Sequence, residues 1–278
     1  MEADVWTIHE RACERGEPSY VDPESGLIVL TELGLEARGA CCGCGCRHCP
    51  YEHENVPADT RAGRIQRPAI LHGRIDDDTG YDVLFWSGGK DSLLARRALA
   101  RERPSRPLVL LTSFDASTRA VAHQEIGLDQ IVRQADALKL PLIGVPLHAG
   151  QVYLDQIEQG LRLVPRPIRL VFGDLHLAEI RTWREQELGP LAERRGAQLH
   201  FPLWNIDYDV LLDDLEASGV RCVISAVPDP AEIGISVGQR FDRSLIDALP
   251  PGVDPFGETG EFHTLAQVWD TPAPLRAK

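Results

Sequence analysis

From Tyr81 onward the chain alternates short apolar runs with longer segments of helical periodicity. The apolar runs are YDVLFW at 81–86, PLVLLTSFDA at 107–116, PLIGVPL at 141–147, IRLVFGDL at 168–175 and VRCVISAV at 220–227. Helical spacing falls between them, at 90–102, 127–140 and 178–195. Strands that alternate with helices of this length form βαβ units with right-handed crossovers. The pattern therefore predicts an α/β fold with a parallel, five-stranded, doubly wound sheet.

The motif SGGKDS, at residues 87–92, lies where the first predicted strand ends and a helix begins. Ligands of such sheets bind at the carboxyl ends of the strands, so chemistry is expected here. The two glycines allow backbone angles closed to other residues, and a helix N-terminus attracts anions. With two hydroxyls and the charge of Lys90, the motif predicts a phosphate cradle. The alternative is a tight glycine turn with an Asp or Ser helix cap.

SGGKDS resembles the PP-loop of the ATP pyrophosphatase superfamily, the adenine nucleotide alpha hydrolases. Three further stretches resemble the diphthine–ammonia ligase branch of that superfamily, and the resemblance covers roughly residues 81–270. They are AHQEIGLDQIVRQADALKLPL at 122–142, VFGDLHLAEIRTWRE at 171–185 with FPLW at 201–204, and GVDPFGETGEFHTL at 252–265.

The resemblance implies a Rossmann-like PP-loop domain over residues 81–278 that uses ATP and Mg²⁺. Such a ligase adenylates a substrate carboxylate, releases pyrophosphate and then amidates the adenylate with ammonia. The substrate would be a small-molecule or protein carboxylate. The residues expected to bind the nucleotide are Ser87, Gly88, Gly89, Lys90, Asp91, Ser92, His123 and Gly173.

Six residues are candidates for catalysis, and each has a plainer alternative reading. Asp91 and Asp174 are expected to meet Mg²⁺ or substrate, but either would also serve as a helix cap. The acids and the imidazole of the 257–263 segment would orient an amine and accept a proton, or would simply form a solvated acidic turn. The predicted catalytic set is Lys90, Asp91, Asp174, Glu258, Glu261 and His263.

Residues 1–60 are predicted to form a small Cys-rich domain, with a hairpin in SYVDPESGLIVLTE and a linker at 61–80. Five of the seven cysteines crowd into nine residues, and Cys46 and Cys49 have the CxxC spacing of a metal knuckle. The cluster predicts Zn²⁺ or an iron–sulfur cluster, with His48 or His53 as substitute ligands, and the alternative is free thiols. The segment resembles an uncharacterised domain ending CCGxGCxxCPY. The predicted metal ligands are Cys41, Cys42, Cys44, Cys46 and Cys49.

The formal net charge of −13 disfavours nucleic acid, whose affinity for proteins comes mostly from Lys and Arg. No apolar run approaches the length of a membrane span and no signal peptide is evident, which predicts a cytoplasmic protein. Trp183 and Trp204 are expected in the core. Two other functions remain open at this point. One is a tRNA-modifying thiolase, and the other is a non-catalytic nucleotide-binding protein with a redox or metal Cys module.

Overall fold

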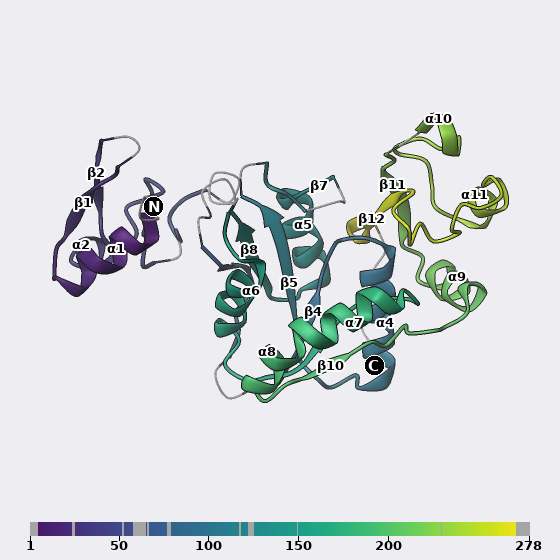
Figure 1. Cartoon of the computed structure of the whole chain (residues 1–278), viewed down its shortest axis with the longest axis horizontal. Coiled ribbons are helices and arrows are strands. Elements are labelled where there is room, and N and C mark those ends of the chain that lie inside the picture. The colour runs from purple at the N-terminus through teal and green to yellow at the C-terminus, as the bar shows by residue number, and fades with distance from the viewer. Residues whose placement is uncertain are drawn as a thin grey trace. The chain divides into compact units, whose positions relative to one another are not determined.

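The computed structural model describes residues 5–23, 26–51, 53–57, 65, 67–76, 79–116, 118–121, 125–148, 150–228 and 230–270. The chain divides into two compact units, Met1–Gln66 and Arg67–Lys278, which are described separately below (Figure 1). The larger unit contains the SGGKDS motif.

The larger unit is built on a six-stranded, mostly parallel sheet with the order β10-β9-β4-β5-β8-β3. Only β3, at one edge, runs antiparallel to its neighbour β8. The chain passes from β4 to β5 and β8 on one side, and from β9 to β10 on the other, so the strand order reverses between β4 and β9. The strands are β3 (Ala69–His72), β4 (Tyr81–Phe85), β5 (Leu108–Asp115), β8 (Leu142–Leu147), β9 (Pro167–Val171) and β10 (Gln198–His200).

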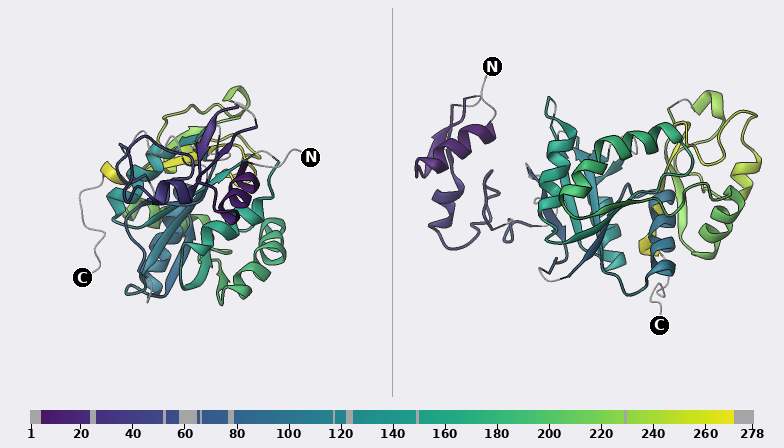
Figure 2. Two further views of the ribbon diagram at one scale, coloured as in Figure 1. Left: turned by 90° about the vertical axis from the view of Figure 1, so that its left-hand side faces the viewer. Right: turned by 60° about the horizontal axis from the view of Figure 1, so that its bottom comes forward.

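Helices cover both faces of this sheet (Figures 1 and 2). Side chains alternate along each strand, so Leu84 packs into the core shared with α4, α5 and α9, while Val83 packs into the core shared with α6 and α8. The helices are α4 (Lys90–Glu102), α5 (Leu128–Leu138), α6 (Tyr153–Arg162), α7 (Ala178–Glu187), α8 (Gly189–Arg194) and α9 (Tyr208–Ala217). The fold is therefore mixed α/β with a layered, Rossmann-like arrangement.

The last part of the unit forms a second, two-stranded antiparallel sheet. Its strand β12 returns to the SGGKDS turn, where the Ala266 amide donates to the Gly88 carbonyl at 2.9 Å. The remaining elements of this unit are short. They are β6 (Ala120–Val121), β7 (Ile126–Gly127), β11 (Arg221–Ala226), α10 (Pro230–Ile233), α11 (Arg243–Asp247), β12 (His263–Gln267) and the 3₁₀ helix η1 (Val268–Asp270).

The sheet differs from the sequence prediction in three strands. The predicted fifth strand, β11, pairs with β12 instead of joining the central sheet. Its place is taken by β10, a three-residue strand that no apolar run marks. A sixth strand, β3, lies inside the segment predicted as a linker. An apolar run indicates a buried strand but does not say which neighbour it will find, because pairing depends on residues distant in sequence.

The helix predicted at 178–195 is two helices, α7 and α8. The break falls at Leu188, where Gly189 and Pro190 follow. Proline lacks the amide that would continue the hydrogen-bond ladder, so it begins a new helix at its first turn.

The smaller unit has a helix, a hairpin and a short second helix, followed by the Cys-rich loop. The predicted hairpin is present, and Tyr20 lies opposite Val29 in its ladder. Gly34 is required where α2 crosses the chain, because a Cβ there would lie 2.2 Å from the Pro18 carbonyl oxygen. The elements are α1 (Val5–Glu14), β1 (Ser19–Val21), β2 (Ile28–Leu30) and α2 (Glu32–Glu36).

Within the described ranges of the chain, no helix combines the length and the apolar character that crossing a bilayer requires.

Candidate functional site

Two hollows share three acidic residues at the carboxyl ends of β4 and β9, where the strand order reverses. The large hollow, about 480 Å³, is lined by the SGGKDS turn and by aromatic side chains such as Trp86 and Tyr153. The small hollow, about 240 Å³, is lined by the 257–264 segment and the start of α7. The residues common to both hollows are Asp91, Asp174 and Glu258. Ligands of α/β sheets bind at such a reversal, so this is the candidate site.

A buried glutamine holds the SGGKDS turn in place. Gln134 of α5 donates to the carbonyl oxygens of Gly88 and Ala266, both at 2.8 Å, and accepts from the Trp86 indole at 2.7 Å. Gly88 has φ +84°, and a Cβ there would meet the Ile131 side chain at 2.6 Å. The turn therefore requires glycine and is braced from two other elements.

Helix capping does not account for the polar residues of the motif. The N-cap of α4 is Gly89, which makes no side-chain cap. Ser92 donates to the Gly89 carbonyl at 3.0 Å, and the Gly89 amide lies 3.4 Å from the Ser87 hydroxyl. Asp91 sits inside the first helical turn, where an acidic side chain complements the helix dipole. Asp91 is therefore not the helix cap that the alternative reading of the motif requires.

Lys90 and Asp91 form a largely buried ion pair. The Lys90 ammonium donates to Asp91 Oδ2 at 2.9 Å and lies over the rings of Phe241 and Phe256, at 5.5 and 5.2 Å from their centroids. Burial raises the pKa of Asp91, although the ammonium opposes that shift. Asp91 Oδ1 is buried without a hydrogen-bond partner among the described residues. An unpaired carboxylate oxygen in a hollow is a ready acceptor for a cation or a donor group.

Gly173 and Asp174 follow β9 and face the same turn. A Cβ at Gly173 would lie 2.9 Å from the Asp91 carbonyl oxygen, so glycine permits the end of β9 to approach the first turn of α4 closely. Asp174 is bound by both nitrogens of one edge of Arg184, which stacks on Phe172 with its guanidinium 4.4 Å from the ring centroid. Asp174 does not cap α7, whose N-cap is Leu177.

Glu258 lies where the two hollows meet, close enough to the other acids for their charges to interact. Burial, and after it the negative charge of Asp91, raises the pKa of Glu258 to about 8. Asp254 and Asp174 push in the same direction, and only Lys90 opposes them. The carboxyl of Glu258 is therefore protonated at neutral pH in the ligand-free protein, and a bound cation would favour its ionisation.

Glu261 and His263 occupy different positions from Glu258. Glu261 accepts from the Asp254 amide at 3.0 Å and from Thr259, so its carboxylate holds the loop together. Burial tends to raise the pKa of Glu261, but these hydrogen bonds outweigh burial and lower it. Glu261 is not among the residues that line either hollow, whereas His263 lines the small one.

Three further expectations concern His123 and the two tryptophans Trp183 and Trp204. His123 lies outside the described residues. The expectation that Trp183 is a core residue is wrong, since 41% of it is exposed. Trp204 is half-buried and lies under the Arg181 guanidinium, 4.7 Å from its ring centroid, so it is not a core residue either. Arginine guanidinium groups lie over both tryptophan rings, a cation–π arrangement that an apolar-face argument does not anticipate.

The acidic residues fit a magnesium ion held jointly with phosphate oxygens. No group of three or more His, Cys, Asp or Glu side chains in the described structure is arranged to hold a metal by itself. Mg²⁺ commonly takes only one or two carboxylates and completes its shell with phosphate and water. The unpartnered Oδ1 of Asp91 meets that requirement, and Asp174 stands beside it.

Four of the five clustered cysteines form two pairs. The sulfurs of Cys42 and Cys46 lie 3.4 Å apart at the surface, and those of Cys41 and Cys49 lie 3.8 Å apart in a small buried cluster. Cys44 points to the Cys42 carbonyl oxygen at 3.6 Å. The described thiols do not gather around one point, so a tetrahedral site would need the pairs to close on an ion.

The proposed substitute ligands are engaged elsewhere. His48 Nε2 lies 2.7 Å from the Tyr20 hydroxyl, and the His48 ring stacks on His9 at 3.8 Å. His53 Nε2 lies 2.7 Å from the Cys46 carbonyl oxygen. Both imidazoles therefore support the loop that carries the thiols.

Sequence reasoning missed three residues of the site. Gln134 lies on the buried face of α5, three residues after Ile131, and a polar residue on such a face was the available signal. Arg184 and Tyr208 gave no signal, because each lies on the partly exposed surface of a helix. Tyr208 donates to Asp254 at 2.9 Å and stacks on Phe256, which supports the loop that carries Glu258.

Comparison with known proteins yields one family and a distant structural likeness. Residues 8–55 match a family of unknown function, DUF5522, which agrees with the resemblance of the N-terminal segment to an uncharacterised Cys-rich domain. The chain is similar to the crystal structure of a predicted subunit of tRNA methyltransferase from Methanocaldococcus jannaschii DSM. The identity is 13% and the TM-score 0.35, over 66% of this chain and 95% of that chain. A likeness this weak does not bear on what the chain does.

Proposed function

We propose that the protein is an ATP pyrophosphatase-type ligase that adenylates a substrate carboxylate and then amidates it. The observation that carries this proposal is the position of the SGGKDS turn, between the ends of β4 and β9, beside two hollows that share Asp91, Asp174 and Glu258. A turn of this composition suits phosphate, and two adjoining hollows suit a nucleotide and an acceptor.

The first step would be attack of the substrate carboxylate oxygen on the α-phosphorus of ATP. The bond between the α-phosphorus and the bridging oxygen breaks, and pyrophosphate leaves. Ser87, Ser92 and the backbone of the turn would donate to the leaving phosphates, where negative charge develops. Mg²⁺ held by Asp91 and Asp174 would neutralise phosphate charge when bound.

The second step would be attack of ammonia on the acyl carbon of the adenylate, with AMP as the leaving group. The new nitrogen bond carries one proton too many, and a base must accept it. The pKa of Glu258 is about 8 without ligand, and a bound cation would favour the ionised carboxylate, which is the form that accepts a proton. Glu258 stands at the junction of the hollows and is the residue assigned to it.

The thiolase alternative needs a reactive thiol, and Cys222 is the one cysteine in the sequence of the larger unit. Cys222 is buried in β11, 1% exposed, and burial raises its pKa to about 12. Such a thiol is not a thiolate at neutral pH and is not a nucleophile.

The test of ATP binding is isothermal titration with Asp91→Asn and Gly173→Val. Asp91→Asn removes a carboxylate from the site, and Gly173→Val forces the end of β9 away from the first turn of α4. Each should weaken Mg²⁺–ATP binding by at least about tenfold. Asp155→Asn is the matched control, since Asp155 is an exposed acid in the first turn of α6. Unchanged affinity in both site variants would refute the nucleotide assignment.

The test of the reaction is its products. Incubation with ATP, ammonium and a panel of carboxylates should release AMP and pyrophosphate in equal amounts. Glu258→Gln should slow amidation more than adenylation, measured as pyrophosphate exchange into ATP. Stoichiometric ADP and phosphate would reject the mechanism while leaving ATP binding intact.

A further inference from the structure

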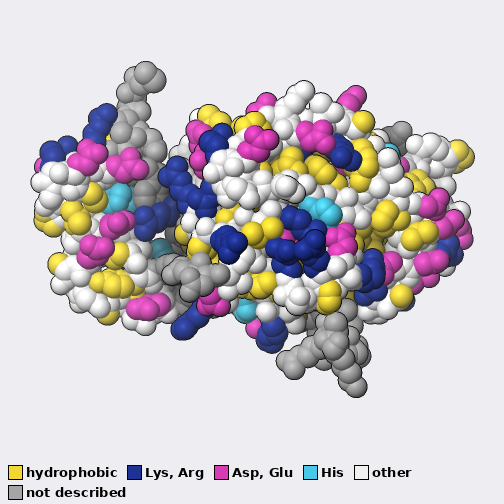
Figure 3. Space-filling model, turned by 90° about the horizontal axis from the view of Figure 1, so that it is seen from below, with side chains coloured by type: hydrophobic (Ala, Val, Ile, Leu, Met, Phe, Trp, Pro, Cys, Tyr) yellow, Lys and Arg dark blue, Asp and Glu magenta, His cyan; other side chains and the backbone are white. Residues whose placement is uncertain are grey.

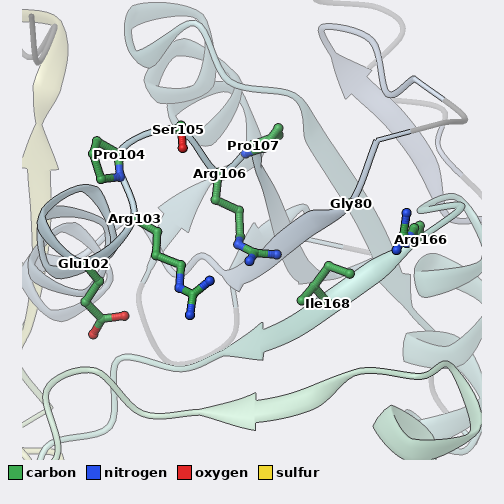
Figure 4. A pocket seen from close by; sticks show the side chains of 9 residues that line it. All are labelled: Gly80, Glu102, Arg103, Pro104, Ser105, Arg106, Pro107, Arg166 and Ile168. Carbon is green, nitrogen blue, oxygen red and sulfur yellow. The ribbon is translucent and has the colours of Figure 1, made fainter.

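A third hollow, the arginine pocket, lies at the amino ends of β4, β5 and β9, whereas the candidate site lies at the carboxyl ends of β4 and β9. It has a volume of about 680 Å³ and is formed by the turn between α4 and β5 together with the residues that precede β4 and β9 (Figure 4). Backbone hydrogen bonds join these three segments. The Tyr81 amide donates to the Arg166 carbonyl at 2.9 Å, and the Asp82 amide donates to the Pro107 carbonyl at 3.0 Å. The wall of the pocket is therefore built by the sheet itself.

Three arginines line this pocket. Arg103 and Arg106 extend from the turn, and Arg166 lies on the far side of Ile168 (Figure 4). Figure 3 shows Lys and Arg side chains gathered near the centre of the face seen from below in Figure 1. On a chain whose net charge is −13, such a gathering creates a local positive field.

The carboxylates near the pocket are already bound by another arginine. Glu102, the one acidic residue of the lining, accepts from Arg169 at 3.0 Å and lies 2.9 Å from His200 Nε2. Asp82 is held by two nitrogens of Arg169, at 2.9 and 2.5 Å, and approaches Arg106 only to 3.9 Å. The positive charge of the pocket is therefore not cancelled by its surroundings.

The lining also indicates which anion fits. Guanidinium groups bind phosphate and carboxylate oxygens in pairs, and a hollow this wide exceeds a single phosphate. None of the nine lining residues is aromatic, so the pocket offers no ring on which a nucleobase would stack. We propose that the arginine pocket is a binding site for a small polyphosphate anion, a chain of two or three phosphates without base recognition. This site is independent of the function proposed above.

The experiment uses inorganic tripolyphosphate as the probe, titrated calorimetrically into the full chain without Mg²⁺ at low salt. The double variant Arg103→Gln/Arg166→Gln removes the two arginines for which no ion pair is seen in the described structure. Its affinity should fall at least about tenfold. Arg162→Gln/Arg221→Gln is the matched control, because both arginines are exposed and lie outside the pocket, and its affinity should change less than about twofold.

Hydrogen–deuterium exchange separates this pocket from the phosphate cradle of the candidate site. Tripolyphosphate should protect the peptide that spans 102–108, and protection there should disappear in the double variant. Protection confined to 87–92 would overturn the proposal. So would equal protection by sulfate at the same ionic strength, or binding of oligothymidylate at 102–108 without binding of tripolyphosphate. Arg166→Glu, checked by its melting temperature, is a second variant that should lose binding while the chain stays folded.

Discussion

The two units of the chain differ in the interactions that stabilise each of them. The larger unit buries two extensive apolar clusters, one on each face of its central sheet. The smaller unit has one apolar cluster, made of Cys41, Cys49 and Val56. Beyond that cluster, its described residues bury a few scattered apolar side chains, such as Ala12 and Leu35, and polar contacts such as Thr31 with the Glu17 carbonyl and Tyr20 with His48.

The difference in apolar burial determines how far each unit depends on individual polar contacts. Burial is non-directional and grows with area, so the larger unit can place acids and arginines at its sheet edges and remain folded. About sixty residues bury too little apolar surface to be secure alone. The smaller unit therefore depends on directional contacts, and a bound metal would add to them.

The largest effect is expected from removing two thiols of the smaller unit. Cys46→Ser/Cys49→Ser should abolish binding of stoichiometric zinc or iron. It should also unfold that unit, because a structural metal supplies folding free energy. Elemental analysis and hydrogen exchange of residues 8–55 measure the two effects. ATP binding at the proposed site should be unchanged, since the two hollows of that site belong to the larger unit.

Cys13→Ser, outside the cluster, is the control for the thiol variants. Metal-free wild-type protein with a fully protected Cys-rich loop would contradict the metal prediction. Loss of ATP affinity in the double variant would contradict the independence of the two units.

The next largest effect is expected in the larger unit, at a buried ion pair. Arg169→Met leaves Asp82, 2% exposed, without its bidentate partner. Breaking such a pair should cost about 3–5 kcal/mol of unfolding free energy, measured by denaturant titration. Arg101→Met removes an exposed pair with Asp214 and should cost less than about 1 kcal/mol. Similar losses of unfolding free energy in both variants would show that the Asp82 pair stabilises the unit no more than an exposed pair does.

A smaller, pH-dependent effect is expected at Glu258. Its pKa is about 8 in the folded chain and near 4.5 ordinarily, so the unfolded chain ionises first as the pH rises. Wild-type stability therefore falls relative to Glu258→Gln between about pH 4.5 and pH 8, and the difference levels off above that range. Thermal melting measures this difference, and the advantage of the variant over the wild type should be largest at pH 8 and above. A constant difference across this range would refute the raised pKa.

The smallest effect is expected at a helix cap of the smaller unit. The Thr31 hydroxyl accepts from the Gly34 amide at 3.2 Å and donates to the Glu17 carbonyl at 2.7 Å. Thr31→Ala should lower the stability of that unit by about 1 kcal/mol, read from hydrogen exchange of its helices. Thr118→Ala, an exposed threonine of the larger unit, should leave that exchange unchanged. If Thr31→Ala also leaves the hydrogen exchange of those helices unchanged, this polar contact does not stabilise the smaller unit.

Much of the site was visible in the sequence because it is local. SGGKDS lies at a strand end and opens α4 at Lys90, as its glycines and polar residues predict. Gly173 and Asp174 follow β9 in the same way. Glu258 and Glu261 could not be told apart, since both lie in one glycine-punctuated loop. Only the packing of that loop turns Glu258 toward the hollows and Glu261 back onto the Asp254 amide.

The sequence by itself determined the alternation of strands and helices, the turn at residues 87–92 and the separate Cys-rich segment, because each arises from neighbours a few residues apart. Only the tertiary structure decided that β11 leaves the central sheet, that β3 and β10 complete it, and that Gln134 braces the turn. It also formed the arginine pocket, whose three arginines come from two segments some sixty residues apart in the sequence. Pairing and convergence of this kind depend on long-range packing, which a local pattern does not encode.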